Sequence, residues 1–256
     1  MKKTSTITAL LISTVVLSTA SPAFAAPLGT NVTVQFKAED ENATGGGNTL
    51  DPTDPNGNGV KPSIPGDGNA TKGPLRIDFA PNFKFGTVVM SGNAADYHPI
   101  NLSLDMLDTA GAITSDKKVV PHYVQVTDNR GNNEGWVLKM SATAFKGTKN
   151  TELDLAATLT LKTNPKFATV VEGSFAPTTL ASSIKLNETD QALITTGKNK
   201  GMGTWATSFG ETPQTLLEAD SRNSYVTLHV PANSKKDPNE NYASTINWTL
   251  ETTPTS

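Results

Sequence analysis

Residues 242–256, YASTINWTLETTPTS, alternate between apolar and polar side chains. One face of the stretch carries Tyr242, Ser244, Ile246, Trp248 and Leu250, and mostly polar residues stand between them. This period of two is typical of a β-strand with one buried face. Pro254 ends the pattern, because proline has no N–H to donate to a β-ladder. The stretch is therefore predicted to be a half-buried strand.

The same alternation recurs upstream at close intervals. Runs of this kind include LRIDF at 75–79, FKFGTVVM at 83–90, YVQVT at 123–127, LDLAATLTL at 153–161 and YVTLHV at 225–230. Thr, Asn, Ser and Gly are abundant and charged residues make up only 18%, which favours strands and turns over helices. Roughly ten to twelve strands are expected. We predict an all-β chain that forms a single sandwich or barrel-like β-domain.

Residues 38–74 differ in composition from the rest of the chain. They are rich in Gly, Pro, Asn and Asp and contain few apolar side chains. Such a segment buries too little apolar surface to offset its ordering entropy, so we expect a flexible loop or linker within the domain. Val32, Val34 and Phe36 alternate in the preceding run, and this predicted strand is expected to pair with the main sheet, because one strand does not fold alone.

The first 25 residues have the pattern of a secretory signal peptide. Lys2 and Lys3 form a basic start, residues 7–17 are apolar but too few to span a bilayer, and AFA at 23–25 supplies the small residues for cleavage. The mature domain is then expected to cover residues 26–256. The sequence shows no later apolar run of membrane-spanning length and no Leu-Pro-x-Thr-Gly sorting motif, so we expect a secreted protein with no membrane anchor.

Charge and cysteine content argue against several classes of function. Loss of the two lysines would leave 19 of the 21 basic residues against 24 acidic ones, a net charge of −5. An acidic chain without a basic patch is poorly suited to nucleic acid or to anionic membrane surfaces, so neither is expected as a partner. Cysteine is absent, which excludes disulfides and a lipoprotein anchor.

Motifs for metal binding or catalysis are weak. The run DPNGNG at 54–59 opens like a calcium loop, but Pro65 stands where that loop needs a bidentate glutamate. His98, His122 and His229 have no second ligand at metal spacing. We predict no metal site, no cofactor and no enzymatic activity. Scattered pairs of carboxylates leave hydrolysis of a wall polymer as the less favoured alternative.

Two Trp-x-Leu triplets lie in strand-like sequence, WVL at 136–138 and WTL at 248–250. The second has the spacing Tyr-x-x-x-Ile-Asn-Trp-x-Leu-x-x-x-Pro. With these two triplets in this order along the sequence, the chain resembles the WxL domain of Gram-positive surface proteins. The family has Leu-Thr where this chain has Ile246 and Asn247. The resemblance implies non-covalent attachment to the cell wall, with peptidoglycan as the expected ligand. It also implies other WxL proteins and a separate wall-binding protein as partners.

The same resemblance makes Trp136, Leu138, Tyr242, Trp248 and Leu250 the candidate binding residues. Two interpretations of the tryptophans stay open. An indole on an alternating strand face fills a large volume in the core, whereas an exposed indole can stack on a sugar ring without any need for charge. A second function also stays open: the domain is then a structural or interaction subunit that reaches the wall only through a separate wall-binding partner.

Overall fold

The computed structural model describes residues 33–44, 48–171, 173–211, 218 and 220–252. The predicted signal peptide at 1–25 and the start of the predicted domain at 26–32 lie outside these residues. The chain divides into two units, Met1–Gln35 and Phe36–Ser256. In the first unit only residues 33–35 are described, and they are exposed and form no strand. All strands of the described residues lie in the second unit.

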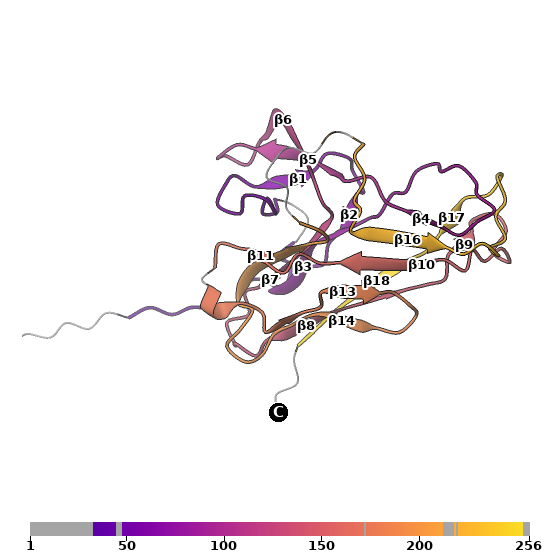
Figure 1. The fold of residues 1–256 in the computed structure, drawn as a ribbon. Helices are drawn as coiled ribbons and strands as arrows, with labels where there is room; N and C mark the ends of the chain where they lie inside the picture. The colour runs from indigo at the N-terminus through magenta and orange to yellow at the C-terminus, as the bar shows by residue number, and fades with distance from the viewer. Residues whose placement is uncertain (1–32, 45–47, 172, 212–217, 219, 253–256) are drawn as a thin grey trace, which may run out of the picture. The chain divides into compact units, whose positions relative to one another are not determined.

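These strands form antiparallel sheets, accompanied by a single 3-10 turn, η1 (Gly173–Phe175), and by no α-helix within the described residues (Figure 1). The sheet with both Trp-x-Leu triplets has the order β12 (Thr179–Leu180), β14 (Gln191–Thr195), β8 (Trp136–Ala142), β18 (Ile246–Thr252). A second has the order β11 (Phe167–Ala168), β15 (Gly203–Ser208), β7 (Tyr123–Asp128), β3 (Leu75–Pro81), β2 (Gly68–Asn69).

A third sheet has the order β13 (Ser183–Lys185), β10 (Thr158–Lys162), β16 (Val226–Val230), β4 (Ala95–Tyr97). Two smaller sheets are β1 (Val60–Pro62), β5 (Leu102–Leu107), β6 (Ile113–Val120), and the pair β17 (Tyr242–Ala243), β9 (Lys146–Gly147). None of these sheets closes into a barrel, and the arrangement is sandwich-like. The prediction of an all-β fold, either sandwich or barrel-like, is confirmed, and the structure has the sandwich-like form.

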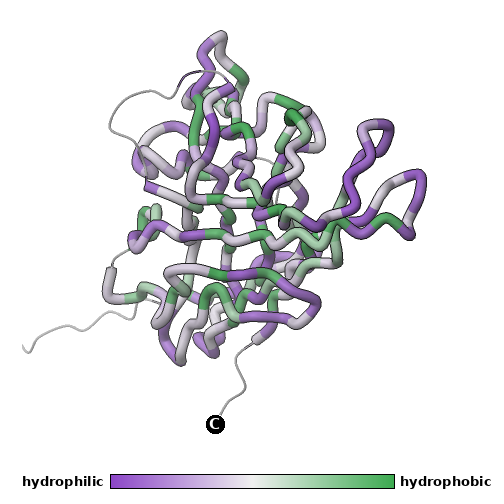
Figure 2. The backbone as a smooth tube through the Cα atoms, turned by 45° about the vertical axis from the view of Figure 1, so that its right-hand side comes forward, coloured by the Kyte–Doolittle hydropathy of each residue, from purple (hydrophilic) through white to green (hydrophobic). Residues whose placement is uncertain are grey.

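The sheet that contains β3, β7 and β15 has packed side chains on both faces. Alternate residues of β7 go to opposite sides, with Val124 and Val126 in the main core and Tyr123 in a second, smaller core. All six residues of β7 are buried, because a strand covered on both faces has no solvated side. In Figure 2, by contrast with the buried β7, the loops that project furthest to the right are largely hydrophilic.

The segment at 38–74, which composition predicts to be a flexible loop or linker, includes two short strands among its described residues. Its described residues, 38–44 and 48–74, contain β1 and β2, which pair with β5 and β3. Val60 is fully buried in the second core, the Thr49 hydroxyl lies 2.7 Å from the Tyr123 hydroxyl, and Lys118 forms a 2.6 Å ion pair with Asp51. Apolar side chains are scarce in this segment, and buried hydrogen bonds of its polar side chains hold it in place instead. Amino-acid composition does not reveal the partners of these hydrogen bonds.

Most of the predicted strands form, with two exceptions among the described residues. The run at 83–90 contains no strand, and Val89 is 90% exposed. Val34 and Phe36 are 75% and 86% exposed without a strand, so the expected pairing of this run with the main sheet is not seen; Val32 lies outside the described residues. Conversely, β6 was not predicted, because its sequence ITSDKKVV is polar and mostly solvated.

Within the part of the chain that the structure describes, no helix has the length and apolar character needed to cross a membrane.

Candidate functional site

The two Trp-x-Leu triplets, far apart in the sequence, lie on neighbouring strands. β8 and β18 pair in an antiparallel register that places Leu250 opposite Leu138 and Trp248 opposite Met140, while Thr252 faces Trp136. These side chains share one face of the sheet, because residues two apart on a strand point the same way. The fold thus brings four of the five predicted binding residues into one two-stranded ladder.

Trp136 is a core residue. Its side chain is 0% exposed, and its indole Nε1–H donates to the carbonyl oxygen of Gly201 at 2.9 Å. Its backbone N–H donates to the Thr196 hydroxyl, and the Thr196 N–H donates back to the Trp136 carbonyl at 2.8 Å. Leu138 is also 0% exposed. An indole enclosed in this way offers no surface for stacking on a sugar, so the core interpretation holds for Trp136.

Trp248 occupies a different environment, because β18 is at the edge of its sheet. The side chain is partly buried and packs against the main core. Its ring centroid lies 6.3 Å from that of Phe209, and Phe209 continues the contact to Phe83 at 5.9 Å. Phe83 in turn stacks on His122 at 4.6 Å. Trp248 therefore ends a chain of ring contacts that runs from the sheet edge into the interior.

Tyr242, the fifth predicted residue, lies apart from the ladder. It sits on β17, opposite Gly147 of β9. Its hydroxyl donates to the carbonyl of Lys235 at 2.7 Å and accepts the N–H of Asp237 at 3.0 Å. Both bonds hold the turn that precedes β17, so the hydroxyl is committed to the protein.

The opposite face of the ladder is polar. Lys139 Nζ donates to Glu251 Oε2 at 2.6 Å, and the Ser141 hydroxyl donates to Asp190 Oδ1 at 2.6 Å. Thr249 donates a longer bond, 3.3 Å, to the other oxygen of Asp190. These groups come from β8, β18 and Asp190, the residue before β14, and such pairing among polar side chains is typical of a solvated sheet face.

A pocket of about 420 Å³ lies between the segment after β1 and the strands β5 and β6. Apolar side chains from several elements line it together with charged ones: Pro62, Ile64, Pro65, Phe79 and Ile113, and Lys61, Asp67 and Asp105. A volume of this size is within the range of small-ligand sites, which combine apolar walls with a few polar groups. Sequence reasoning missed the pocket because most of its lining comes from the segment predicted to be a loop.

The charged groups of the pocket are held in place by the protein. The Ser63 hydroxyl donates to Asp105 Oδ1 at 2.7 Å, and this bond, helped by Lys117, holds the pKa of Asp105 below its usual range. Asp67 is buried and forms an ion pair with Lys84. Ile64 and Ile113 are each 51% exposed at the pocket. The site therefore presents carboxylates and an ammonium group beside open apolar surface.

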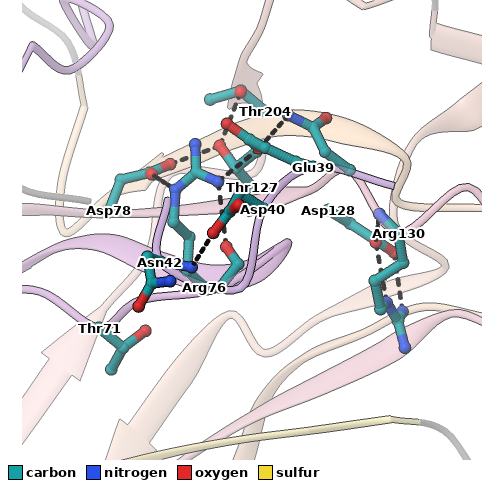
Figure 3. A network of polar contacts seen from close by, with 12 residues as sticks. Glu39, Asp40, Asn42, Thr71, Arg76, Asp78, Thr127, Asp128, Arg130 and Thr204 are labelled. Atoms are coloured by element: carbon teal, nitrogen blue, oxygen red, sulfur yellow. Dashed lines mark hydrogen bonds and ion pairs between the residues drawn. The ribbon is translucent and has the colours of Figure 1, made fainter. Parts of the chain in front are cut away.

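A polar network around Arg76, Asp78 and Thr127 holds Glu39, at the start of the segment at 39–44 (Figure 3). Arg76 donates to Glu39 Oε2 and to Asp78 Oδ1, each at 2.7 Å. Asp78 also accepts bonds from Gln125 and Thr127. The hydrogen bond from Arg76 lowers the pKa of Glu39. Each group in this network is satisfied by a protein partner, so we assign it a role in holding the fold.

In the described residues, no group of three or more His, Asp or Glu side chains is arranged to hold a metal ion. The run at 54–59 forms a turn, in which the Gly57 N–H donates to the Asp54 carbonyl at 3.0 Å. His122 is buried, whereas His229 is exposed and contacts Asp96 at 2.6 Å.

Comparison with known proteins gives one clear match. The sequence model of a family described as "WxL domain surface cell wall-binding" matches residues 25–254, nearly the whole chain. No curated protein and no solved structure matches significantly.

Proposed function

The chain belongs to the WxL family of surface cell-wall-binding domains, and on that premise we propose that it attaches non-covalently to peptidoglycan through the pocket beside β1. The family assignment is the observation that carries the wall-binding role. It also makes the protein one of the cell surface, and we propose that the segment at 1–25 directs its secretion. No reaction is part of this proposal.

The burial of the triplets supports an indirect role for them. Trp136 and Leu138 are 0% exposed, and Leu250 lies directly opposite Leu138 on the same face. Side chains in that position stabilise the domain by removing apolar area from water. We therefore propose that the four triplet residues first expected to bind the polymer stabilise the sheet of β12, β14, β8 and β18, and that Tyr242 stabilises the turn before β17.

The pocket's chemistry supports the peptide part of peptidoglycan as its ligand. Stem peptides combine small aliphatic side chains with free amines and carboxylates. Ile64 and Ile113 offer apolar contacts, Asp105 can accept from an ammonium group, and Lys61 can pair with a carboxylate. The chain has a net negative charge, so local pairing and apolar contact have to supply the affinity.

The test is co-sedimentation of the purified mature chain with purified peptidoglycan, together with titration of soluble muropeptides. Asp105→Asn keeps an acceptor for Ser63 but removes the charge, and we expect binding to weaken roughly tenfold, because a charge-assisted hydrogen bond is lost. Asp116→Asn is the matched control. Asp116 is exposed on β6 and does not line the pocket, so binding should not change.

Other outcomes decide between the alternatives. If the wild-type chain stays in solution with peptidoglycan, direct attachment is wrong and docking on a separate wall-binding protein takes its place. Other WxL proteins would then be the first partners to assay. Release of soluble muropeptides by the purified chain would instead establish a hydrolase.

A further inference from the structure

The strand β18 is an edge strand without the usual protection. It pairs with β8 on one side, and no backbone pairing to its other side occurs among the described residues. Its register with β8 runs through all seven residues, whereas the pairs β8–β14, β3–β7 and β5–β6 each contain a register shift. An open edge of this kind is a template for another strand, and proteins normally blunt it with bulges, proline or lysine. The sequence INWTLET of β18 has none of these.

The apolar face of β18 is incompletely covered. On β8, Leu138 and Met140 are 0% exposed. Their partners on β18, Leu250 and Trp248, are only partly buried. Both side chains pack against the main core and keep part of their surface exposed. A strand added at this edge would bury both residues further.

We propose that β18 of a second copy of this chain occupies the edge, antiparallel and centred on Thr249. In this register Thr249 faces Thr249 of the second copy, and Trp248 faces Leu250 of the second copy. On the polar face, Asn247 stands opposite Glu251 of the second copy. The two sheets of the order β12-β14-β8-β18 then join into one sheet across a two-fold axis.

Self-complementarity selects a second copy over another partner. The sequence Trp-Thr-Leu, read against itself about the central threonine, places the large indole opposite an apolar leucine, and it places threonine opposite threonine, which is a favourable cross-strand pair. No like charges stand opposite each other. The single charged residue of the strand, Glu251, is already paired with Lys139 of its own chain at 2.6 Å.

The dimer would carry two copies of the proposed pocket. Two linked sites bind a repeating polymer more tightly than one, because the second contact becomes intramolecular. That consequence rests on the proposed function, whereas the interface itself does not. Dimerisation is measured without any wall polymer, so its failure and the failure of wall binding are distinguishable.

The absence of cysteine allows a clean cross-linking test. Thr249→Cys places two thiols opposite each other, with Cβ atoms about 4.5–5.5 Å apart, close to the span of a disulfide. We expect this variant to run mainly as a disulfide-linked dimer on a non-reducing gel after mild oxidation. Asn247→Cys and Glu251→Cys are the register controls. Each lies about 13 Å from its own copy and should stay monomeric alone, while an equimolar mixture of the two should cross-link.

Light scattering on the wild-type chain provides the second measurement. We expect the measured mass to rise towards that of a dimer as the protein concentration increases. Thr249→Lys and Thr249→Glu should each be monomeric and fold normally by circular dichroism, and their mixture should dimerise, because opposite charges then meet at the axis. A wild-type chain that remains monomeric at the highest concentration reached overturns the proposal. So does a dimer in which Asn247→Cys cross-links alone as well as Thr249→Cys.

Discussion

The strands β8 and β18 carry the same Trp-x-Leu motif and pair with each other, yet their tryptophans lie in different environments. β8 is flanked by β14 and β18, and Trp136 is 0% exposed with its indole N–H bonded to Gly201. Among the described residues, β18 pairs with one strand only, and Trp248 is partly exposed. The motif therefore specifies an inward-facing apolar pair, and the position of the strand in the sheet determines how deeply the pair is buried.

This difference suggests a division of roles between the two triplets. The one on β8 stabilises the main core, since its Trp136 and Leu138 have no solvent-facing surface. The one on β18 keeps exposed apolar area at an open edge, which suits it for association. The following expectations test this division, in order of decreasing effect.

Trp136→Ala should have the largest effect. Removal of a fully buried indole leaves a cavity and an unpaired Gly201 carbonyl, at a cost of about 3–5 kcal/mol in the free energy of unfolding. Trp248→Ala should cost about 1–2 kcal/mol, because part of its ring already lies in water. Chemical denaturation of both variants measures the difference. Equal losses would contradict the division of roles.

Gly201→Ala probes the loop that closes over Trp136. A Cβ atom there would lie 2.7 Å from Trp136 Nε1, and the φ of +76° is strained for alanine. We expect a loss of about 2–4 kcal/mol in unfolding free energy. Gly131→Ala is the matched control, since its φ is +73° but nothing lies within 4 Å of the added atom. It should cost only about 1 kcal/mol. Similar losses for the two variants would show that the packing on Trp136 is unimportant.

His122 makes the ring chain beneath Trp248 sensitive to acid. Burial lowers the pKa of His122 from 6.5 to about 3. The folded state then binds the proton less readily than the unfolded state. The free energy of unfolding therefore has its full value above pH 6.5 and declines as the pH falls towards 3. The expected slope is at most about 1.4 kcal/mol per pH unit.

Unfolding curves between pH 7 and pH 4 measure this slope, and His122→Gln should flatten it. His229→Gln is the control, because His229 is exposed. An unchanged slope in His122→Gln would show that other groups cause the acid sensitivity.

The ion pair between Lys139 and Glu251 joins the two strands on their polar face and should have the smallest effect. Its side chains are 31% and 49% exposed, so solvent screens their attraction. A double-mutant cycle with Lys139→Met and Glu251→Gln should give a coupling of about 0.2–1 kcal/mol. A larger coupling would mean that the polar face, and not the indoles, joins the strands.

Local pattern predicted much of the fold but little of the site. Alternation located β3, β7 and β16 correctly, because these strands have regular inward and outward sides or are buried throughout. It failed for 83–90, because this run pairs with no other strand of the described residues and Val88 and Val89 remain exposed. The pocket could not be predicted from the sequence, because Asp67 and Asp105 line it together only as a result of the pairing of distant strands.

The sequence by itself determined that the chain is all-β and that it belongs to the WxL family, because strand periodicity and the order of two short motifs are properties of the linear chain. Only the tertiary structure decided that the two triplets are neighbours, that Trp136 is enclosed while Trp248 stands at an edge, and that the segment at 38–74 builds one wall of a pocket. The physical reason is that alternation specifies which face of a strand is apolar, whereas burial depends on the strands at either side, which come from remote parts of the sequence.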